Sequence, residues 1–313
     1  MKNSQRLTGF TSTPVKATRS ARRRTRVAAA VAALGVAAAP VALFASSAGA
    51  STSVSTGYWI AKGDGAIFEV GSANANGSAL GTSSSAIVGV ASTPDGNGYT
   101  EVAADGGVFT YGDAQYYGSL GGTTLSSPIV GIVSTADGKG YLLVAADGGV
   151  FAFGDAVYYG SLGGQTLSAH ITGIALTPSG KGYWLVGADG GVYAFGDATF
   201  SGSYYSTFGV ASSSPIVGIT SSSSGGYALL SQSGGVFTYG GANFYSSPSG
   251  SGATGKDVAI EYTSDGLGYW VLQSDGGVYA FGDATGLTGS VTYPTGGSSN
   301  FTSSAAVGFA SQL

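Results

Sequence analysis

Short apolar runs alternate with turns rich in Gly, Asp and Ser throughout residues 57–313. One unit reads IVGIVST (129–135), YLLVAA (141–146), the turn Asp147-Gly148, VFAF (150–153) and VYYGSL (157–162). Asp-Gly between apolar runs predicts a tight hairpin of type I′, because both central residues of that turn need positive φ. No window carries an apolar stripe with the 3.6-residue period of a helix. We therefore predict four antiparallel strands in each unit and almost no helix.

The unit repeats about every 42 residues, and the dipeptide Gly-Tyr begins its second run in every copy. Six copies of four short antiparallel strands predict an all-β fold, a six-bladed β-propeller. Both faces of YLLVAA and VFAF are apolar, as expected for blades that pack face to face on two neighbours. The tyrosines that mark the copies are Tyr58, Tyr99, Tyr141, Tyr183, Tyr227 and Tyr269.

The two ends of the repeat region are offset by one strand. The region begins on the second run of a unit, at Gly57, and ends on a first run, Val307–Ser311. In a ring, this offset lets the last strand complete the first blade and removes an exposed sheet edge. The alternative is an open β-solenoid, which would need polar end caps instead. We expect a ring closed by the C-terminal strand pairing into the first blade.

Residues 1–50 have the features of a secretory signal peptide. Eight Lys or Arg and no acid precede an apolar stretch at 27–44, and small residues lead to Ala50. An uncleaved membrane anchor is the alternative. The run Arg22-Arg23-Arg24 leaves both the general and the twin-arginine export routes open. We expect residues 51–313 to be secreted or held at the cell surface as the propeller domain.

The charge of the expected mature chain excludes several partners. All sixteen acids follow Ala50, against four lysines and no Arg, so residues 51–313 carry a formal charge of −12. Phosphate backbones and anionic membranes are repelled by such a surface, so neither nucleic acid nor anionic lipid is an expected partner. The chain has no Cys, which excludes disulfides and thiolate metal sites. No cofactor is predicted.

The stretches GKGYWLVGADGGVYAFGDA (180–198) and DGKGYLLVAADGGVFAFGDAVYYGSL (137–162) carry a family resemblance. They are similar to tandem repeats of secreted proteins from GC-rich bacteria, with a pattern close to DGKGYWLVASDGGVFAFGDA. The resemblance covers residues 57–313. Repeats of this kind often accompany hydrolase or cell-wall domains. The resemblance therefore implies the repeat fold and secretion, and it implies no chemistry for the repeats themselves.

The sequence predicts no catalytic and no metal-binding residue. The single histidine, His170, takes a slot that holds Pro128 and Pro215 in sibling repeats, and it has no partner histidine for a zinc site. The recurring aspartates of the turns, such as Asp105 and Asp113, lie beside Gly, where a carboxylate caps backbone N–H groups. Rings of such carboxylates can also bind calcium, but the turn role is the favoured interpretation.

Three glutamates break the repeat pattern: Glu69, Glu101 and Glu261. Glu261 falls in the first strand of its unit, which lines the channel of a propeller. Its carboxylate is a candidate for binding a cation or for acting as an acid. A solvated channel residue is the simpler interpretation.

Aromatic residues are the stronger binding candidates. The pairs Tyr116-Tyr117 and Tyr158-Tyr159 recur, which favours packing between blades. Two inter-repeat loops, 202–216 and 289–307, are longer than the others and contain extra aromatics among Ser, Thr and Asn. Rings and hydroxyls together suit sugar or peptide surfaces. The predicted binding residues are Tyr204, Tyr205, Phe208, Tyr293, Phe301 and Glu261.

These patterns favour an exported, non-enzymatic binding module that recognises a cell-envelope glycan or a surface protein through its inter-repeat loops. The first alternative is a hydrolase or lyase acting on a glycan or ester at the channel mouth. The second alternative is a structural scaffold of the envelope or matrix with no ligand.

Overall fold

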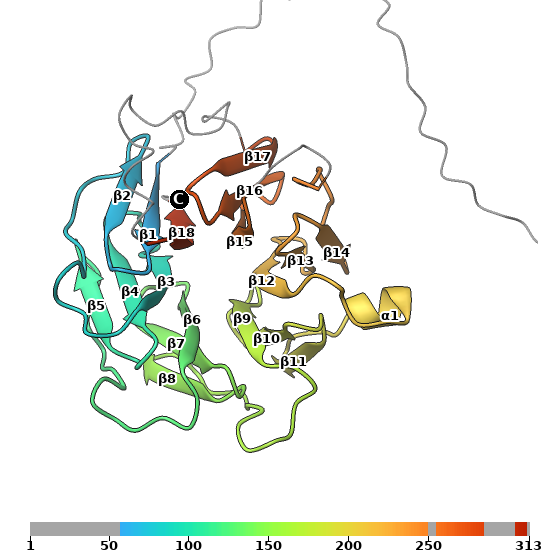
Figure 1. The fold of residues 1–313 in the computed structure, drawn as a ribbon, viewed down its shortest axis with the longest axis horizontal. Helices are drawn as coiled ribbons and strands as arrows, with labels where there is room; N and C mark the ends of the chain where they lie inside the picture. The colour runs from blue at the N-terminus through green and yellow to red at the C-terminus, as the bar shows by residue number, and fades with distance from the viewer. Residues whose placement is uncertain (1–56, 250–254, 285–303, 312–313) are drawn as a thin grey trace, which may run out of the picture. The chain divides into compact units, whose positions relative to one another are not determined.

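The computed structural model describes residues 57–249, 255–284 and 304–311. These residues form six three-stranded antiparallel sheets arranged around a centre, an all-β architecture consistent with a β-propeller (Figure 1). In each sheet a middle strand pairs with a central strand on one side and an outer strand on the other. The central strands are β3 (Ile87–Ser92), β6 (Ile129–Ser134), β9 (Ile171–Leu176), β12 (Ile216–Ser221), β15 (Asp257–Tyr262) and β18 (Ala306–Ser311). The middle strands are β1 (Tyr58–Lys62), β4 (Tyr99–Ala103), β7 (Gly140–Ala145), β10 (Gly182–Gly187), β13 (Tyr227–Ser231) and β16 (Gly268–Gln273). The outer strands are β2 (Ile67–Val70), β5 (Val108–Tyr111), β8 (Val150–Gly154), β11 (Val192–Gly196), β14 (Val236–Tyr239) and β17 (Val278–Gly282).

The chain's last described strand completes its first sheet. β18 pairs antiparallel with β1, with Ile60 opposite Phe309 and Trp59 opposite Ala310. The sheet order is therefore β18-β1-β2, although the two paired strands stand at opposite ends of the sequence. This is the strand pairing that the offset of the repeat region predicts.

The predicted fourth strand of each unit is wrong. Residues 157–162 form no strand, and each described sheet has three. The backbone of this segment is held by the next sheet instead: Tyr159 N–H donates to the Tyr183 hydroxyl (3.1 Å), which donates to Gly160 O (2.5 Å). Gly160 has φ 134° and packs against Phe195. The segment therefore crosses to β10 rather than running along β8.

The core lies in the seams, meaning the contacts between neighbouring sheets. Each of the six seams contains a cluster of buried apolar side chains, such as Leu142, Ile171 and Leu185 between the third and fourth sheets. The repeated tyrosine of the middle strand is buried in this core, with Tyr99, Tyr183 and Tyr227 at 0% exposure. Apolar burial on both faces of each sheet explains the blurred alternation of the sequence.

A backbone hydrogen bond also bridges every seam, from the first residue of a central strand to the turn of the preceding sheet. Ile171 N–H, for example, donates to Ala146 O at 2.9 Å. The other five donors and acceptors are Ile87 to Gly63, Ile129 to Ala104, Ile216 to Ala188, Asp257 to Gln232 and Ala306 to Ser274.

The Asp-Gly hairpins differ from the predicted type I′ turn. Gly106 N–H donates to Ala103 O (2.8 Å), and Ala103 N–H donates to Gly107 O (2.8 Å). The loop thus has three residues, a pattern in which one Gly supplies the left-handed conformation. Gly106 has φ 81°, and a Cβ there would lie 2.6 Å from Leu120 Cβ. Both the conformation and the close approach require glycine.

One short helix, α1 (Tyr204–Phe208), lies in the long loop before β12. Ser203 and Ser206 form a capping box at its start, and Gly209 ends it in the left-handed conformation with φ 72°. Within the described ranges, no helix is long and apolar enough to cross a membrane.

Candidate functional site

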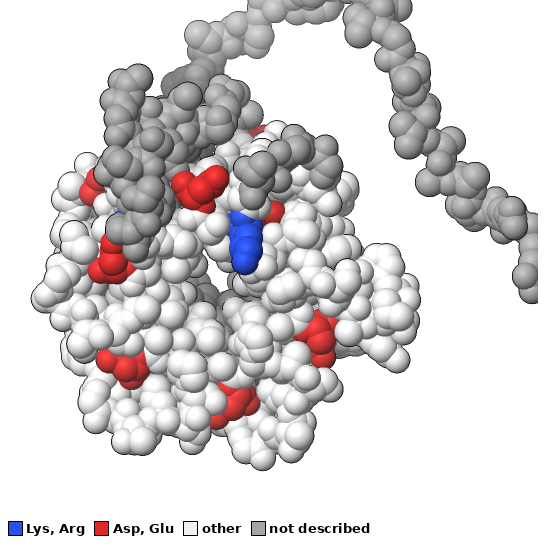
Figure 2. Space-filling view, viewed as in Figure 1, with Lys and Arg blue, Asp and Glu red and all other residues white. Residues whose placement is uncertain are grey.

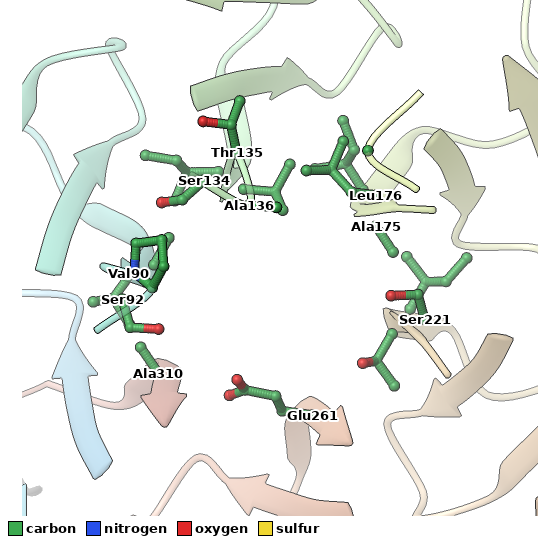
Figure 3. A pocket seen from close by; sticks show the side chains of 18 of the residues that line it. Val90, Ser92, Ser134, Thr135, Ala136, Ala175, Leu176, Ser221, Glu261 and Ala310 are labelled. Atoms are coloured by element: carbon green, nitrogen blue, oxygen red, sulfur yellow. The ribbon is translucent and has the colours of Figure 1, made fainter. Parts of the chain in front are cut away.

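A pocket of about 470 Å³ lies where the six central strands converge (Figure 3). The space exists because the fifth residue of the central strand is small in most sheets. Next to these fifth residues, at the ends of the central strands, lie the hydroxyl groups of Ser92, Ser134, Thr135, Thr177 and Ser221. The small residues of the fifth position are Ala91, Val133, Ala175, Thr220 and Ala310, and the sixth sheet has Glu261 there.

Glu261 is the only acid among the described residues that line this pocket. Its Oε1 accepts a hydrogen bond from the Ser311 hydroxyl of β18 (2.7 Å), and its Oε2 is buried without a hydrogen-bond partner. Burial raises the pKa of this carboxyl to about 7, against the opposing effect of the Ser311 hydrogen bonds. The carboxyl end of Glu261 therefore joins β15 to β18 while the side chain lines the pocket.

Glu101 is a second buried acid, outside the pocket. It lies in β4 at 0% exposure; its Oε2 accepts from Ala79 N–H (2.8 Å), and its Oε1 has no hydrogen-bond partner. Burial raises its pKa to about 7 as well. The sequence places Glu101 in a middle strand, but only the structure shows that the carboxyl is enclosed in a seam. Glu69, in contrast, is exposed on β2.

The predicted loop aromatics fall into different environments. Tyr204 takes the packing position that Leu120 and Leu162 occupy in earlier repeats. In all three cases the Cβ of the residue packs directly against a glycine of a hairpin. Tyr205 and Phe208 are 62% and 50% exposed. Tyr293 and Phe301 lie outside the described residues, as does the predicted signal peptide.

Glu261 and the α1 aromatics belong to opposite ends of the central strands. α1 precedes the start of β12, whereas Glu261 lies one residue before the end of β15. The pocket residues also lie toward the strand ends and the hairpins that follow them, such as Thr93 and Thr135. The structure therefore separates the predicted binding residues into two regions.

The recurring aspartates act in turns. Asp105 Oδ1 accepts from Gly107 N–H (2.9 Å), and Asp147, Asp189 and Asp275 make the same bond. No group of three or more His, Cys, Asp or Glu in the described ranges could hold a metal ion. Figure 2 shows the acidic side chains on the face in view spaced around a central hollow rather than gathered at one point.

His170 is exposed, and its carbonyl oxygen accepts a hydrogen bond from Ala188 N–H (2.9 Å), which extends the β9–β10 pairing within one sheet. Pro128 and Pro215 supply their carbonyls in the same way to Ala146 and Gln232. The shared role uses only the backbone, which explains why the slot accepts both histidine and proline. No protein-family model matches this chain, and no curated protein matches its sequence.

Proposed function

We propose that this protein is an exported, non-enzymatic binding module on a closed propeller, and that it recognises a cell-envelope glycan by holding one sugar residue in the central pocket. Export is supported by the character of residues 1–50. Closure is supported by the seam between the last and first sheets, which has both an apolar cluster and a backbone hydrogen bond, like the other five.

The composition of the pocket wall is the observation that carries the ligand class. Hydroxyls from several strands surround the opening, and aliphatic side chains such as Ile132 and Ile174 lie beside them. A sugar presents hydroxyls and an apolar face together, and binding pockets for small molecules usually measure about 300–1,000 Å³. Glu261 adds one carboxyl that is protonated in part near pH 7, so it can donate or accept.

Calorimetric titration tests this proposal. Residues 51–313 are titrated with the methyl glycosides of glucose, galactose, mannose and N-acetylglucosamine. We expect at least one to bind, and we expect Ser134→Phe, which fills the pocket, to weaken its affinity at least tenfold. Ser168→Phe, on an exposed loop residue, is the matched control and should bind as the wild type does. Absence of binding by every glycoside, or equal affinity in Ser134→Phe, would contradict the proposal.

The raised pKa of Glu261 favours a second candidate, a hydrolase or lyase that uses this carboxyl as a general acid. Against it, the pocket offers no second carboxylate among its described residues. Glu261→Gln separates the two functions. The binding module predicts that this variant keeps its ligand, and the enzyme predicts that hydrolysis of chromogenic glycosides or esters is present in the wild type and lost in the variant.

A further inference from the structure

Four exposed aromatic rings occupy one repeat position on the outside of the sheets. Tyr116, Tyr158, Phe200 and Phe244 are 59%, 55%, 54% and 56% exposed. Each follows an outer strand and stands at the next seam, so the four mark four consecutive seams. We call them the aromatic arc.

In the two Tyr-Tyr pairs, the second ring carries the packing role that the sequence assigns to the pair. Tyr117 packs on Tyr141 with ring centroids 5.9 Å apart, and Tyr159 packs on Tyr183 at the same distance. In these pairs the second tyrosine faces the core and the first faces outward. One ring of each pair therefore provides the expected packing between blades, and the other ring, which belongs to the arc, stays exposed.

The backbone beside each ring of the arc is held in the same way at all four seams. The N–H of the residue after each ring donates to the core tyrosine hydroxyl of the next sheet. The four bonds are Tyr117 to Tyr141 (3.1 Å), Tyr159 to Tyr183 (3.1 Å), Ser201 to Tyr227 (3.2 Å) and Tyr245 to Tyr269 (3.3 Å). Because the backbone is fixed at each ring, a ligand that stacks there need not order the chain, which lowers the entropy cost of binding.

The surroundings of the arc favour an uncharged partner. Exposed polar side chains, Gln115, Thr199 and Asn243, precede three of the rings. Exposed Asp113, Asp155 and Asp197 stand three residues before three of them, so a polyanion is repelled. Each ring lies in its own seam, with a whole sheet between it and the next. Four equal, separate sites suit a partner with a repeating unit better than a protein with one continuous apolar patch.

We infer that the aromatic arc is a docking surface for an extended, uncharged polysaccharide, whose sugar rings stack on Tyr116, Tyr158, Phe200 and Phe244. The inference rests on the glycan recognition proposed above and extends it from one sugar residue to a polymer. Because the contacts are multivalent, loss of one ring lowers the apparent affinity only a few-fold, whereas loss of all four multiplies these effects.

Affinity gel electrophoresis tests the arc. Residues 51–313 are run through gels that contain dextran, galactomannan or glucomannan, each uncharged, or the polyanion polygalacturonate. We expect retardation by at least one uncharged polymer, and at least a twentyfold loss of apparent affinity in the variant with all four arc residues changed to Ala. A variant with Leu80, Val210 and Leu267 changed to Ala, which removes exposed apolar side chains outside the arc, is the control and should be retarded fully.

Three results would overturn the arc: no retardation in any uncharged gel, retardation by polygalacturonate alone, or unchanged retardation of the four-fold Ala variant. The pocket variant Ser134→Phe tells the two proposals apart. If it abolishes binding of methyl glycosides while the arc variant binds polymer normally, the arc fails and the pocket stands. If the arc variant no longer binds the polymer while Ser134→Phe binds both the methyl glycoside and the polymer as the wild type does, the pocket fails and the arc stands.

Discussion

In sheet β6-β7-β8 the central strand begins with Ile129, which pairs with Ala145 of the middle strand. In sheet β15-β16-β17 the same two positions hold Asp257 and Gln273, which are buried and joined by a hydrogen bond of 3.0 Å. The two sheets have the same strand order and the same seam bonds. The repeat therefore specifies the backbone, and it tolerates a change from an apolar to a polar core position.

The buried charged side chains lie in three neighbouring sheets: the sixth, the first and the second. Lys62 and Glu101 lie in the first two sheets and Asp257 in the last, whereas no charged residue is buried in the described part of the three sheets between them. Burial raises the pKa of Asp257 to about 6. We call the β15-β16-β17, β18-β1-β2 and β3-β4-β5 sheets the junction sheets. Because burial raises the pKa of their acids, we expect these sheets to be the pH-sensitive part of the fold.

Removal of β18 should have the largest effect. Deleting residues 304–313 exposes the edge of β1 and uncovers the cluster that contains Tyr58 and Ile60. We expect loss of most of the roughly 5–15 kcal/mol that stabilises a domain of this kind, seen as a non-cooperative thermal transition by circular dichroism. Deleting only 312–313 is the control. A cooperative transition within a few degrees of the wild type would show that β18 does not hold the junction.

Raising the pH should destabilise the protein through its buried acids. The pKa of Glu101 rises from 4.5 to about 7 on folding, so the folded chain keeps a proton that the unfolded chain releases. Stability is therefore full below pH 4.5 and falls as the pH approaches 7. Glu101→Gln should reduce this loss by about 3 kcal/mol between pH 4.5 and 8, measured by urea unfolding at a series of pH values.

Glu69→Gln, on the exposed face of β2, is the matched control for this titration and should follow the wild-type profile. Equal pH profiles for Glu101→Gln and the wild type would refute the role of the buried acid. A profile that rises with pH in the wild type would refute the sign.

Loss of one core hydroxyl should have a smaller effect on stability. It tests the three sheets that contain no buried charge among their described residues. Tyr141→Phe removes a hydroxyl that accepts from Tyr117 N–H (3.1 Å) and donates to Gly118 O (2.5 Å). We expect a loss of about 1–3 kcal/mol, because two backbone groups lose their partner. Tyr158→Phe, which removes an exposed hydroxyl that donates to Ser161 Oγ, should change the free energy of unfolding by less than about 0.5 kcal/mol. Equal effects would contradict the bridging role of the core tyrosines.

The positions of the strands were predictable because β-branched residues mark the strands and Gly-containing turns mark their ends. Neither signal depends on distant contacts. The first run of the unit, predicted as a strand at 129–135, agrees with β6 (Ile129–Ser134), since its β-branched residues end at a turn. The fourth strand was not predictable, because VYYGSL reads as a strand until Gly160 and the Tyr183 hydroxyl of another sheet are taken into account.

The candidate site was predictable only in part. The position of Glu261 in a central strand indicated the channel, but its hydrogen bond to Ser311 joins residues fifty positions apart and has no sequence signal. α1 had a sequence signal that does not depend on helical periodicity: Ser203 and Ser206 three residues apart, followed by Gly209. The aromatic arc was hidden because three of its four rings have an aromatic residue directly after them, and only packing decides which ring of each such pair faces outward.

Hydrogen–deuterium exchange with bound sugar tests the central claim, that the pocket of the central strands is the site of recognition. The protein is measured free and saturated with the methyl glycoside that binds best in titration. The account predicts slower exchange in the hairpins that border the pocket, at 93–97, 135–139 and 177–181, and no change in α1. Slower exchange confined to 203–210, or no change anywhere, would contradict it.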